Sequence, residues 1–192
     1  MTLKRMFDLI CATIGLVFFS PLMAMIAILV RCTSPGSVVF RQLRIGHHGK
    51  EFELLKFRSM KDGSGDPGEH LSRDDHRITP IGKILRRTHL DELPQLWNVA
   101  RGDMSLVGPR PLTPEWIGRW GRNSPRIVTR SQCMPGLTGL AQIKVHRNHS
   151  DAASYLRKNL LFDVVYCRRK CFWLDLTILA KTPLVILRRQ GV

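Results

Sequence analysis

Residues 9–30 read LICATIGLVFFSPLMAMIAILV, an apolar stretch of 22 residues with no charged side chain and no histidine. As a straight α-helix this stretch would be roughly 33 Å long, which is close to the thickness of the hydrocarbon core of a bilayer. The run is too long for a cleaved signal peptide, and no A-x-A site leads from it into a secreted-looking domain. The sequence therefore predicts an N-terminal segment that enters the membrane.

Ser20 and Pro21 lie at the middle of this stretch, where proline removes a backbone hydrogen bond and bends a helix. Basic residues lie on both sides of the stretch: Lys4, Arg5, Arg31, Arg41 and Arg44. Because positive charge favours the cytoplasmic side, both ends are expected there. Two interpretations fit the residues: a helix that enters one leaflet, breaks at Ser20-Pro21 and returns, or a proline-kinked helix that spans the bilayer.

The chain has 192 residues, which suffices for one domain with a hydrophobic core but not for two independent ones. It carries 30 Lys+Arg against 15 Asp+Glu, a net charge of +15, so we expect anionic partners such as nucleic acid, phospholipid or a phosphorylated metabolite. Nucleic-acid binders interleave aromatic side chains with arginines, whereas only 7% of this chain is aromatic, much of it within apolar runs. We therefore expect no nucleic acid among the partners.

The cysteines are odd in number and form no C-x-x-C pair, which argues against a disulfide framework and for a reducing compartment. Cys167 and Cys171 are one helical turn apart, but no histidine or second cysteine pair joins them at zinc-like spacing. Two half-buried helix thiols are the favoured interpretation.

Regular structure after the apolar stretch is predicted to be mainly α-helical with a few short β strands (α+β). Apolar runs at 38–40 and 52–57, separated by glycines, predict a β-hairpin. Thr79-Pro80 indicates a helix start with proline at the first helical position, and residues 151–166 are predicted to be helical. The apolar stripe of the helix after Pro80 consists of Ile81, Ile84, Leu85 and Thr88.

A further helix is predicted from about Asp91 to a stop at Gly102, with Pro94 in its first turn. Its apolar stripe consists of Leu93, Leu96, Trp97 and Ala100. Near the C-terminus, residues 171–187 are apolar but interrupted by Asp175, Lys181 and Pro183, so they are too short and too polar to span a membrane. With flanking arginines, this segment fits either an interfacial helix at anionic headgroups or a buried globular helix.

The adjacent carboxylates Asp91 and Glu92 are unusual in so basic a chain. Thr88-x-x-Asp91 fits a capping box, so Asp91 has a purely structural interpretation. One cap does not explain two carboxylates, however, because neighbours on a helix point about 100° apart. A carboxylate near arginines such as Arg86 and Arg87 is held ionised, and an ionised oxygen can attack phosphorus or bind a divalent cation.

Several basic residues are placed to bind phosphate. If 56–60 form a strand, Lys56 and Arg58 share one face, and Pro109-Arg110-Pro111 holds a guanidinium on a rigid loop. Arg147-Asn148, after a Pro-Gly turn, could supply another contact. Four other arginines are interpreted as solvated surface charges: Arg122, Arg126, Arg130 and Arg157. Neither a P-loop nor a dinucleotide-binding fingerprint is present.

Together these motifs resemble the monotopic phosphoglycosyl transferases, the bacterial sugar transferase family that loads a phosphosugar onto polyprenol phosphate. The resemblance covers nearly the whole chain and is most specific in LDELPQLWNVARGDMSLVGPRP (90–111). The other matching stretches are KRMFD (4–8), Ser20-Pro21, RIGHHGKEFELLKFRSM (44–60), DHRITPIGKILR (75–86), PGLTGLAQ (135–142), Arg147-Asn148, FDVVY (162–166) and LDLTIL (174–179).

The resemblance implies that Asp91 is a nucleophile that attacks the β-phosphorus of a UDP-sugar, releases UMP and carries the phosphosugar to polyprenol phosphate. Glu92 is then expected to hold Mg²⁺ against the diphosphate. The implied substrate-binding residues are Lys56, Arg58, Arg86, Pro109, Arg110, Pro111, Gln142, Arg147 and Asn148. Departures from the family pattern are His89, where serine is common, and His146, where glycine is common.

The resemblance also implies an architecture: a re-entrant membrane helix in residues 1–33, broken at Ser20-Pro21, and a transferase domain in residues 34–192 that includes the C-terminal interfacial helix. This domain is expected on the cytoplasmic face of the bacterial inner membrane, in contact with membrane lipid. Two rival functions are a catalytically inactive membrane scaffold of the same fold and a membrane-tethered nucleic-acid-binding protein.

Overall fold

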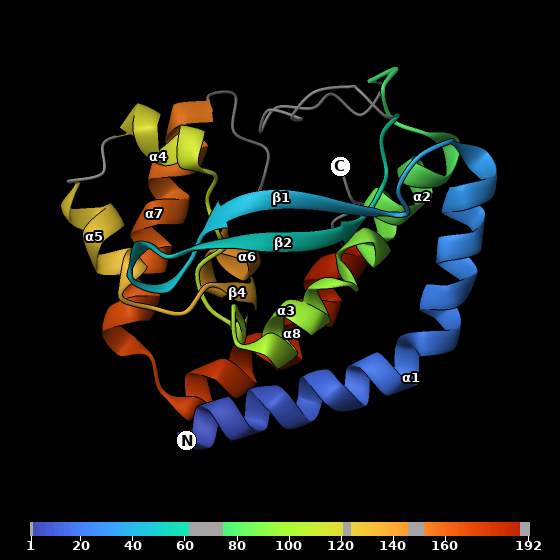
Figure 1. Cartoon of the computed structure of the whole chain (residues 1–192). Helices are drawn as coiled ribbons and strands as arrows, with labels where there is room; N and C mark the ends of the chain where they lie inside the picture. Colours follow the sequence, from blue (N-terminus) through green and yellow to red (C-terminus); the bar gives the residue numbers. More distant parts are fainter. Residues whose placement is uncertain (1, 62–74, 121–123, 146–151, 189–192) are drawn as a thin grey trace.

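The computed structural model describes residues 2–61, 75–120, 124–145 and 152–188 (Figure 1). It is mainly helical with short strands, which confirms the predicted fold class. In chain order the elements are α1 (Leu3–Thr33), β1 (Val39–Ile45), the 3-10 turn η1 (His47–Gly49), β2 (Glu51–Phe57), α2 (Pro80–Thr88), the 3-10 turn η2 (Leu90–Glu92), α3 (Gln95–Arg101), β3 (Ser105–Val107), α4 (Pro114–Trp120), α5 (Pro125–Ser131), β4 (Gly136–Thr138), α6 (Leu140–Lys144), α7 (Ala152–Arg169) and α8 (Phe172–Arg188).

Helix α1 is a long helix with a sharp bend, and its two arms border two sides of the molecule (Figure 1). Pro21 lies inside the helix, and the Ser20 hydroxyl donates to the Val17 carbonyl at 2.8 Å. The helix continues through Pro21, so the predicted break at Ser20-Pro21 is a bend in one continuous helix, as expected where proline removes a single hydrogen bond.

Each arm of α1 buries one side against the domain. Ala12, on the first arm, packs into a core cluster with residues of β2, α3, β3, α7 and α8. Ile26 and Val30, on the second arm, pack with Phe57 of β2 and Leu85 of α2. The outward side of the helix is also apolar and is formed by Leu3, Met6, Ile10, Ile14, Val17, Phe18, Met25, Ile28 and Leu29.

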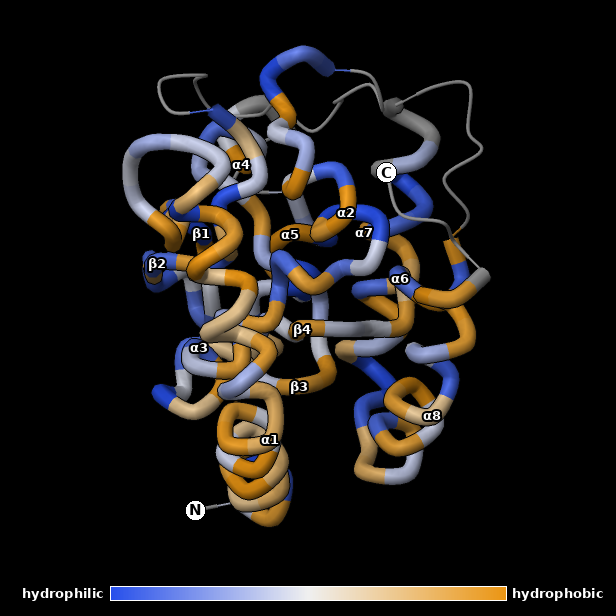
Figure 2. Tube along the Cα trace, turned by 90° about the vertical axis from the view of Figure 1, so that its right-hand side faces the viewer, coloured by the Kyte–Doolittle hydropathy of each residue, from blue (hydrophilic) through white to orange (hydrophobic). Residues whose placement is uncertain are grey.

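This exposed apolar side distinguishes α1 from a core helix. Within the described ranges α1 is the one helix long and apolar enough to cross a membrane, and only 11% of its most apolar window is buried. Figure 2 shows α1 as a mainly hydrophobic element at the edge of the molecule, with α8 at the same end. Trp173 and Leu187 of α8 are likewise 76% and 78% exposed. Part of the apolar surface of α8 therefore lies outside the core and is exposed.

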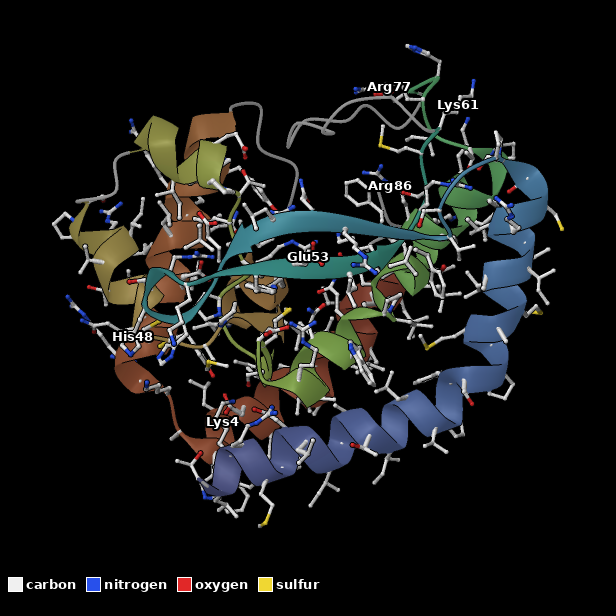
Figure 3. The ribbon with its side chains drawn as sticks, in the orientation of Figure 1. Lys4, His48, Glu53, Lys61, Arg77 and Arg86 are labelled. Carbon is white, nitrogen blue, oxygen red and sulfur yellow. The ribbon has the colours of Figure 1, made fainter. Side chains whose placement is uncertain are left out.

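The KRMFD motif anchors the first arm of α1. Lys4 Nζ lies 2.6 Å from Asp175 Oδ2 of α8, and the Asp175 carboxylate also accepts from the Tyr166 hydroxyl of α7 at 2.7 Å. Figure 3 shows Lys4 where the start of α1 meets α8. Asp8 is buried and accepts from the Ser105 hydroxyl at 2.8 Å and the Leu106 N–H at 3.2 Å. These motif residues therefore tie α1, β3, α7 and α8 together.

The predicted β-hairpin is confirmed, since β1 and β2 pair antiparallel from Val39 opposite Phe57 to Ile45 opposite Glu51. Asn98 of α3 is fully buried and bonds to the backbone of β2 on either side of Leu54: its Oδ1 accepts from Leu55 N at 3.0 Å, and its Nδ2 donates to Glu53 O at 2.7 Å. A buried side chain with both amide groups bonded in this way sets the position of β2 on α3.

Helix α2 begins as predicted, with Thr79 as the N-cap whose hydroxyl accepts from the Gly82 N–H, and Pro80 as the first residue. The predicted apolar stripe is only partly correct. Leu85 is 2% exposed, whereas Ile84 is 57% exposed. His89, in the left-handed conformation with φ 57°, ends the helix.

The helix predicted from Asp91 begins four residues later, at Gln95, although it ends at Gly102 as expected. Residues 90–92 form the 3-10 turn η2, because the left-handed His89 has just reversed the chain and the N–H groups of Glu92 and Leu93 bond three residues back. Of the predicted stripe, Leu96 is buried but Trp97 is 53% exposed. Asp91 therefore lies in a turn between two helices.

Strands β3 and β4 are a short parallel pair that positions the loop after Val107. A Cβ on Gly136 would lie 2.0 Å from Gly108 N, so only glycine permits this approach. The Gly136 N–H donates to the Pro109 carbonyl at 2.9 Å. The segment that carries Arg110 is thereby fixed to β4.

Candidate active site

The two adjacent carboxylates lie where β2, η2 and the loop at 109–111 meet. Glu92 Oε1 accepts from Lys56 Nζ at 3.0 Å and from Arg110 Nη2 at 2.6 Å. Lys56 comes from β2 and Arg110 from the loop between β3 and α4, so Glu92 joins segments that are 36 and 18 residues away in sequence. The structure thus brings together three of the residues predicted for the site.

Glu92 is held ionised. Burial by itself raises the pKa of a carboxyl group, but the charges of Arg110 and Lys56, each hydrogen-bonded to Glu92, hold its pKa well below the usual range. The side chain of Glu92 is only 14% exposed, whereas that of Arg110 is 48% exposed. Arg110 therefore keeps a solvent-accessible part of its guanidinium free to meet an anion while it orients Glu92.

The pKa of Asp91 moves in the opposite direction. Asp91 is 8% exposed. This burial, together with the charge of Glu92, raises the pKa of Asp91 from 3.8 to about 6. This pKa is lowered by the charges of Lys56, Arg86 and Arg110, but their effect is smaller than the effect of burial. At pH 7 the Asp91 carboxylate is ionised, yet it is more basic than an ordinary aspartate. Two neighbouring carboxyls with pKa values moved in opposite directions are typical of sites where the two groups have different roles.

The capping interpretation of Asp91 is wrong. Neither η2 nor α3 has a side-chain cap, and Pro94, not Asp91, occupies the N-cap position of α3. The Thr88 hydroxyl, which would begin the capping box, donates to the carbonyl of Ile84 at 2.8 Å. His89 ends α2, and Pro94 is the N-cap of α3, so Asp91 caps neither helix.

The loop that carries Arg110 is supported from behind by a buried ion pair. Arg130 of α5 and Asp163 of α7 are 7% and 4% exposed, and Arg130 Nε donates to Asp163 Oδ2 at 2.8 Å. Arg130 Nη2 also donates to the backbone carbonyl of Arg110. The interpretation of Arg130 as a solvated surface charge is therefore wrong, because Asp163, 33 residues away, supplies a buried countercharge.

Arg58 does not lie where the strand pattern predicted. Strand β2 ends at Phe57, and the Arg58 guanidinium donates to the carbonyls of Pro35 and Ser34, both at 2.7 Å. Arg58 is 5% exposed. The prediction that Arg58 shares a phosphate-binding face with Lys56 is therefore wrong, because its guanidinium binds the chain at the end of α1.

Arg86 lies in the last turn of α2, on the side of the β1–β2 hairpin (Figure 3), and its charge acts on Asp91. Pro109 and Pro111 act through their backbones: Pro109 O accepts from Gly136 N, and Pro111 O accepts from Arg44 Nη1 at 3.0 Å. Gln142 lies on α6, next to the Gly108 and Gly139 backbones. Arg147 and Asn148 lie outside the described residues.

The oxygen atoms of the two carboxylates are the ligands that the site offers to a divalent cation. Mg²⁺ commonly binds through one or two carboxylates plus substrate phosphates. In the described part of the chain, no three His, Cys, Asp or Glu side chains are grouped to hold a metal. Among the described residues, both short contacts of Glu92 use Oε1, while Oε2 has one 3.4 Å contact, with Arg110. Glu92 Oε2 therefore fits as the protein ligand of a cation whose other ligands would be diphosphate oxygens.

The sequence is similar to those of known proteins. A sequence model of the family "bacterial sugar transferase" matches residues 1–189. The chain belongs to the bacterial sugar transferase family. A UDP-N-acetylgalactosamine-undecaprenyl-phosphate N-acetylgalactosaminephosphotransferase of Aeromonas hydrophila is 40% identical over 190 residues, which are 98% of this chain and 44% of the relative. A UDP-glucose:undecaprenyl-phosphate glucose-1-phosphate transferase of Caulobacter vibrioides is 39% identical over 93% of this chain and 67% of its own length.

Family members of similar length also exist. The uncharacterized sugar transferase EpsL of Bacillus subtilis is 41% identical over 192 residues, which are 100% of this chain and 91% of the relative. The chain thus spans less than half of the Aeromonas relative but nearly all of EpsL.

In this family member we predict that the Asp91 carboxyl titrates near pH 6. It should be ionised above this pH and protonated below it, because burial disfavours the charged form. Infrared difference spectra of the carboxyl stretch between about pH 4 and about pH 8 measure this titration. Asp91→Asn removes the signal and separates it from Asp163, whose pKa is also raised by burial. A residue-91 signal that titrates near the usual value of 3.8 would contradict the role of burial.

Proposed function

We propose that this chain transfers a phosphosugar from a UDP-sugar to undecaprenyl phosphate, with Asp91 as the nucleophile. The observation that carries the proposal is the asymmetric carboxylate pair. Glu92 is bound by the cationic side chains of Lys56 and Arg110, while Asp91 is buried and basic, and its carboxylate makes no hydrogen bond to the residues that the structure describes. The names of the relatives support the substrates, since they pair undecaprenyl phosphate with UDP-N-acetylgalactosamine or UDP-glucose.

In the first step, an Asp91 carboxylate oxygen attacks the β-phosphorus of the UDP-sugar. The bond between this phosphorus and the bridging oxygen breaks, and UMP leaves with the bond electrons. A phosphosugar is left on Asp91 as an acyl phosphate. In the second step, a phosphate oxygen of undecaprenyl phosphate attacks the same phosphorus, which gives the polyprenyl diphosphosugar and regenerates the carboxylate. Dividing the transfer in this way replaces one difficult displacement by two easier ones.

The cations of the site neutralise the charge that develops on phosphorus. Arg110, which is half exposed and held by Glu92, is suited to grip the diphosphate, with Lys56 and Arg86 beside it. A Mg²⁺ ion held by Glu92 Oε2 and diphosphate oxygens would supply further Lewis-acid stabilisation of the leaving UMP. The role of Glu92 is thus to position Lys56 and Arg110 and to offer one oxygen to the cation.

We further propose that α1 is re-entrant and that the domain lies on the cytoplasmic face of the inner membrane. A straight helix of 31 residues would be about 46 Å long and would separate its ends across the bilayer. Here the start of α1 is held by Asp175 and the residues after its end by Arg58, so both ends contact one domain. The exposed apolar sides of α1 and α8 would then face lipid, with α8 at the interface.

The nucleophile is tested with Asp91→Asn. We predict a loss of UMP release of at least about a thousandfold, because the amide cannot form the acyl phosphate. Glu53→Gln is the matched control, since Glu53 is 55% exposed and pairs with Arg41 on the surface. Mass spectrometry of the peptide with residue 91, trapped during turnover with a UDP-sugar, should show the phosphosugar adduct. Substantial activity in Asp91→Asn, or turnover without any adduct, refutes the mechanism.

The cation is tested by chelation. EDTA should stop UMP release and added Mg²⁺ should restore it, because the diphosphate charge is otherwise uncompensated. Glu92→Gln should raise the Mg²⁺ concentration for half-maximal rate by on the order of tenfold, measured beside Glu53→Gln. Equal rates with and without EDTA exclude a role for the cation.

The membrane topology is tested with a thiol at each end of α1. Cys32 is exposed near the end of the helix, and Thr2→Cys adds a thiol at its N-cap. In a background without the other four cysteines, a membrane-impermeant maleimide should label both positions in inside-out vesicles and neither in right-side-out vesicles. Labelling of the two ends from opposite sides shows a spanning helix instead.

A further inference from the structure

Two exposed apolar side chains flank the turn that carries Asp91. Ile84 of α2 is 57% exposed, and Trp97 of α3 is 53% exposed. Every other residue in the stretch 90–100 is buried or partly buried. Neither Trp97 nor Ile84 belongs to a hydrophobic core cluster of the described residues. Beside a reactive carboxylate, two such side chains indicate a surface that meets an apolar partner.

Both side chains belong to helices that pack against α1. Leu96, next to Trp97, meets the first arm of α1, where a Cβ on Gly15 would lie 3.2 Å from Leu96 Cδ1. Leu85, next to Ile84, is in one core cluster with residues of the second arm. Figure 1 shows α2 and α3 in the angle between these two arms. Trp97 and Ile84 are therefore carried by helices attached to the apolar segment that the proposed orientation places in the membrane.

Helix α3 is held in this place by polar contacts as well. The Arg5 guanidinium of α1 donates to the carbonyl oxygens of Val99 and Ala100, at 2.5 and 2.7 Å. On another side of α3, Asn98 bonds to the backbone of β2. Trp97 is thus presented by a helix that is fixed to both α1 and β2. A surface that is ordered before binding loses little conformational entropy when a ligand covers it.

We propose that Trp97 and Ile84 bind the first isoprene units of the polyprenyl phosphate acceptor. The contact rests on the proposed function, in which the phosphate of this acceptor reaches Asp91. A polyprenyl phosphate joins a phosphate directly to an apolar chain, so its site needs a cation and an exposed apolar surface close together. Arg110, half exposed beside Glu92, supplies the cation. The segment from Asp91 to Trp97 extends about 9 Å along a helix, so a phosphate at Asp91 brings the first isoprene units within reach of Trp97.

The depth of the site makes this contact favourable. A site that accepts a water-soluble nucleotide sugar and a lipid lies at the boundary between membrane and water. Tryptophan is favoured at this boundary because its ring is apolar and its N–H is polar. A prenyl chain that covers the exposed part of Trp97 removes apolar area from water, which stabilises the bound acceptor. The UDP-sugar is polar, so only the acceptor should depend on this surface.

The kinetics of both substrates test the contact on the full-length protein. Trp97→Ala should raise the KM for undecaprenyl phosphate on the order of tenfold, because less apolar area is covered, while the KM for the UDP-sugar stays nearly unchanged. Ile84→Ser should shift the same KM in the same direction. Trp97→Phe keeps an aromatic ring and should restore most of the affinity. Trp173→Ala is the matched control, since Trp173 is 76% exposed on α8 and should alter neither KM.

Three kinetic results overturn the contact. The first is an acceptor KM in Trp97→Ala that equals the wild-type value. The second is a rise in this KM that is equally large in Trp173→Ala, because a general loss of membrane contact then explains it. The third is an equal rise in the KM of both substrates, which indicates a displaced α3.

Photo-cross-linking tests the contact without any substitution. A polyprenyl phosphate with a diazirine on its first isoprene units is irradiated with the wild-type protein. Mass spectrometry should place the adduct at Trp97 or Ile84, and an excess of undecaprenyl phosphate should prevent it. Adducts only on other residues, such as those of α8, refute the contact. If the wild-type protein releases no UMP from UDP-sugars, the proposed function fails, whereas the cross-link still decides whether a polyprenyl phosphate binds at these two residues.

Discussion

The ion pairs of Glu92 with Lys56 and Arg110 are the interaction on which the arrangement of the site depends. They join a strand, a turn and a loop that lie 18 to 36 residues apart in the sequence. A half-buried lysine and a carboxylate would each be costly to bury alone, so removing one partner leaves the others uncompensated. The neighbouring Asp91 benefits because the local cations are already engaged by Glu92. It keeps a raised pKa, beside the positive charges of Lys56, Arg86 and Arg110.

Around this centre, many of the motif residues have structural roles. Asn98, in the middle of the most specific motif, sets β2 on α3 through two hydrogen bonds to the backbone. Asp8 and Asp175 attach α1 to β3 and α8. Arg58 holds the chain just after α1. These contacts place both ends of an apolar helix on one domain. The same contacts therefore maintain the site and support the proposed orientation of the domain at the membrane surface.

The sequence predicted several features because each depends on local chemistry. The hairpin, the start of α2 at Thr79-Pro80 and the stop of α3 at Gly102 are determined by strand alternation, proline and glycine. The prediction of α3 from Asp91 failed because the left-handed His89 and the 3-10 turn after it have no distinctive pattern in the sequence. The exposed Trp97 and Ile84 were assigned to apolar stripes, since periodicity identifies a face but not what covers it.

The sequence by itself determined that an apolar helix with a central proline precedes a strongly basic domain, and that two carboxylates stand side by side within it. Only the tertiary structure decided their states. The pKa of Asp91 is raised by burial, and that of Glu92 is lowered by the contacts with Lys56 and Arg110. These two contacts join residues that are 36 and 18 positions apart in the sequence. The support of Arg110 by Arg130 and Asp163 arises in the same way. Local patterns report which residues are present on a segment, whereas the environment of a charge is created by segments that meet only in the folded chain.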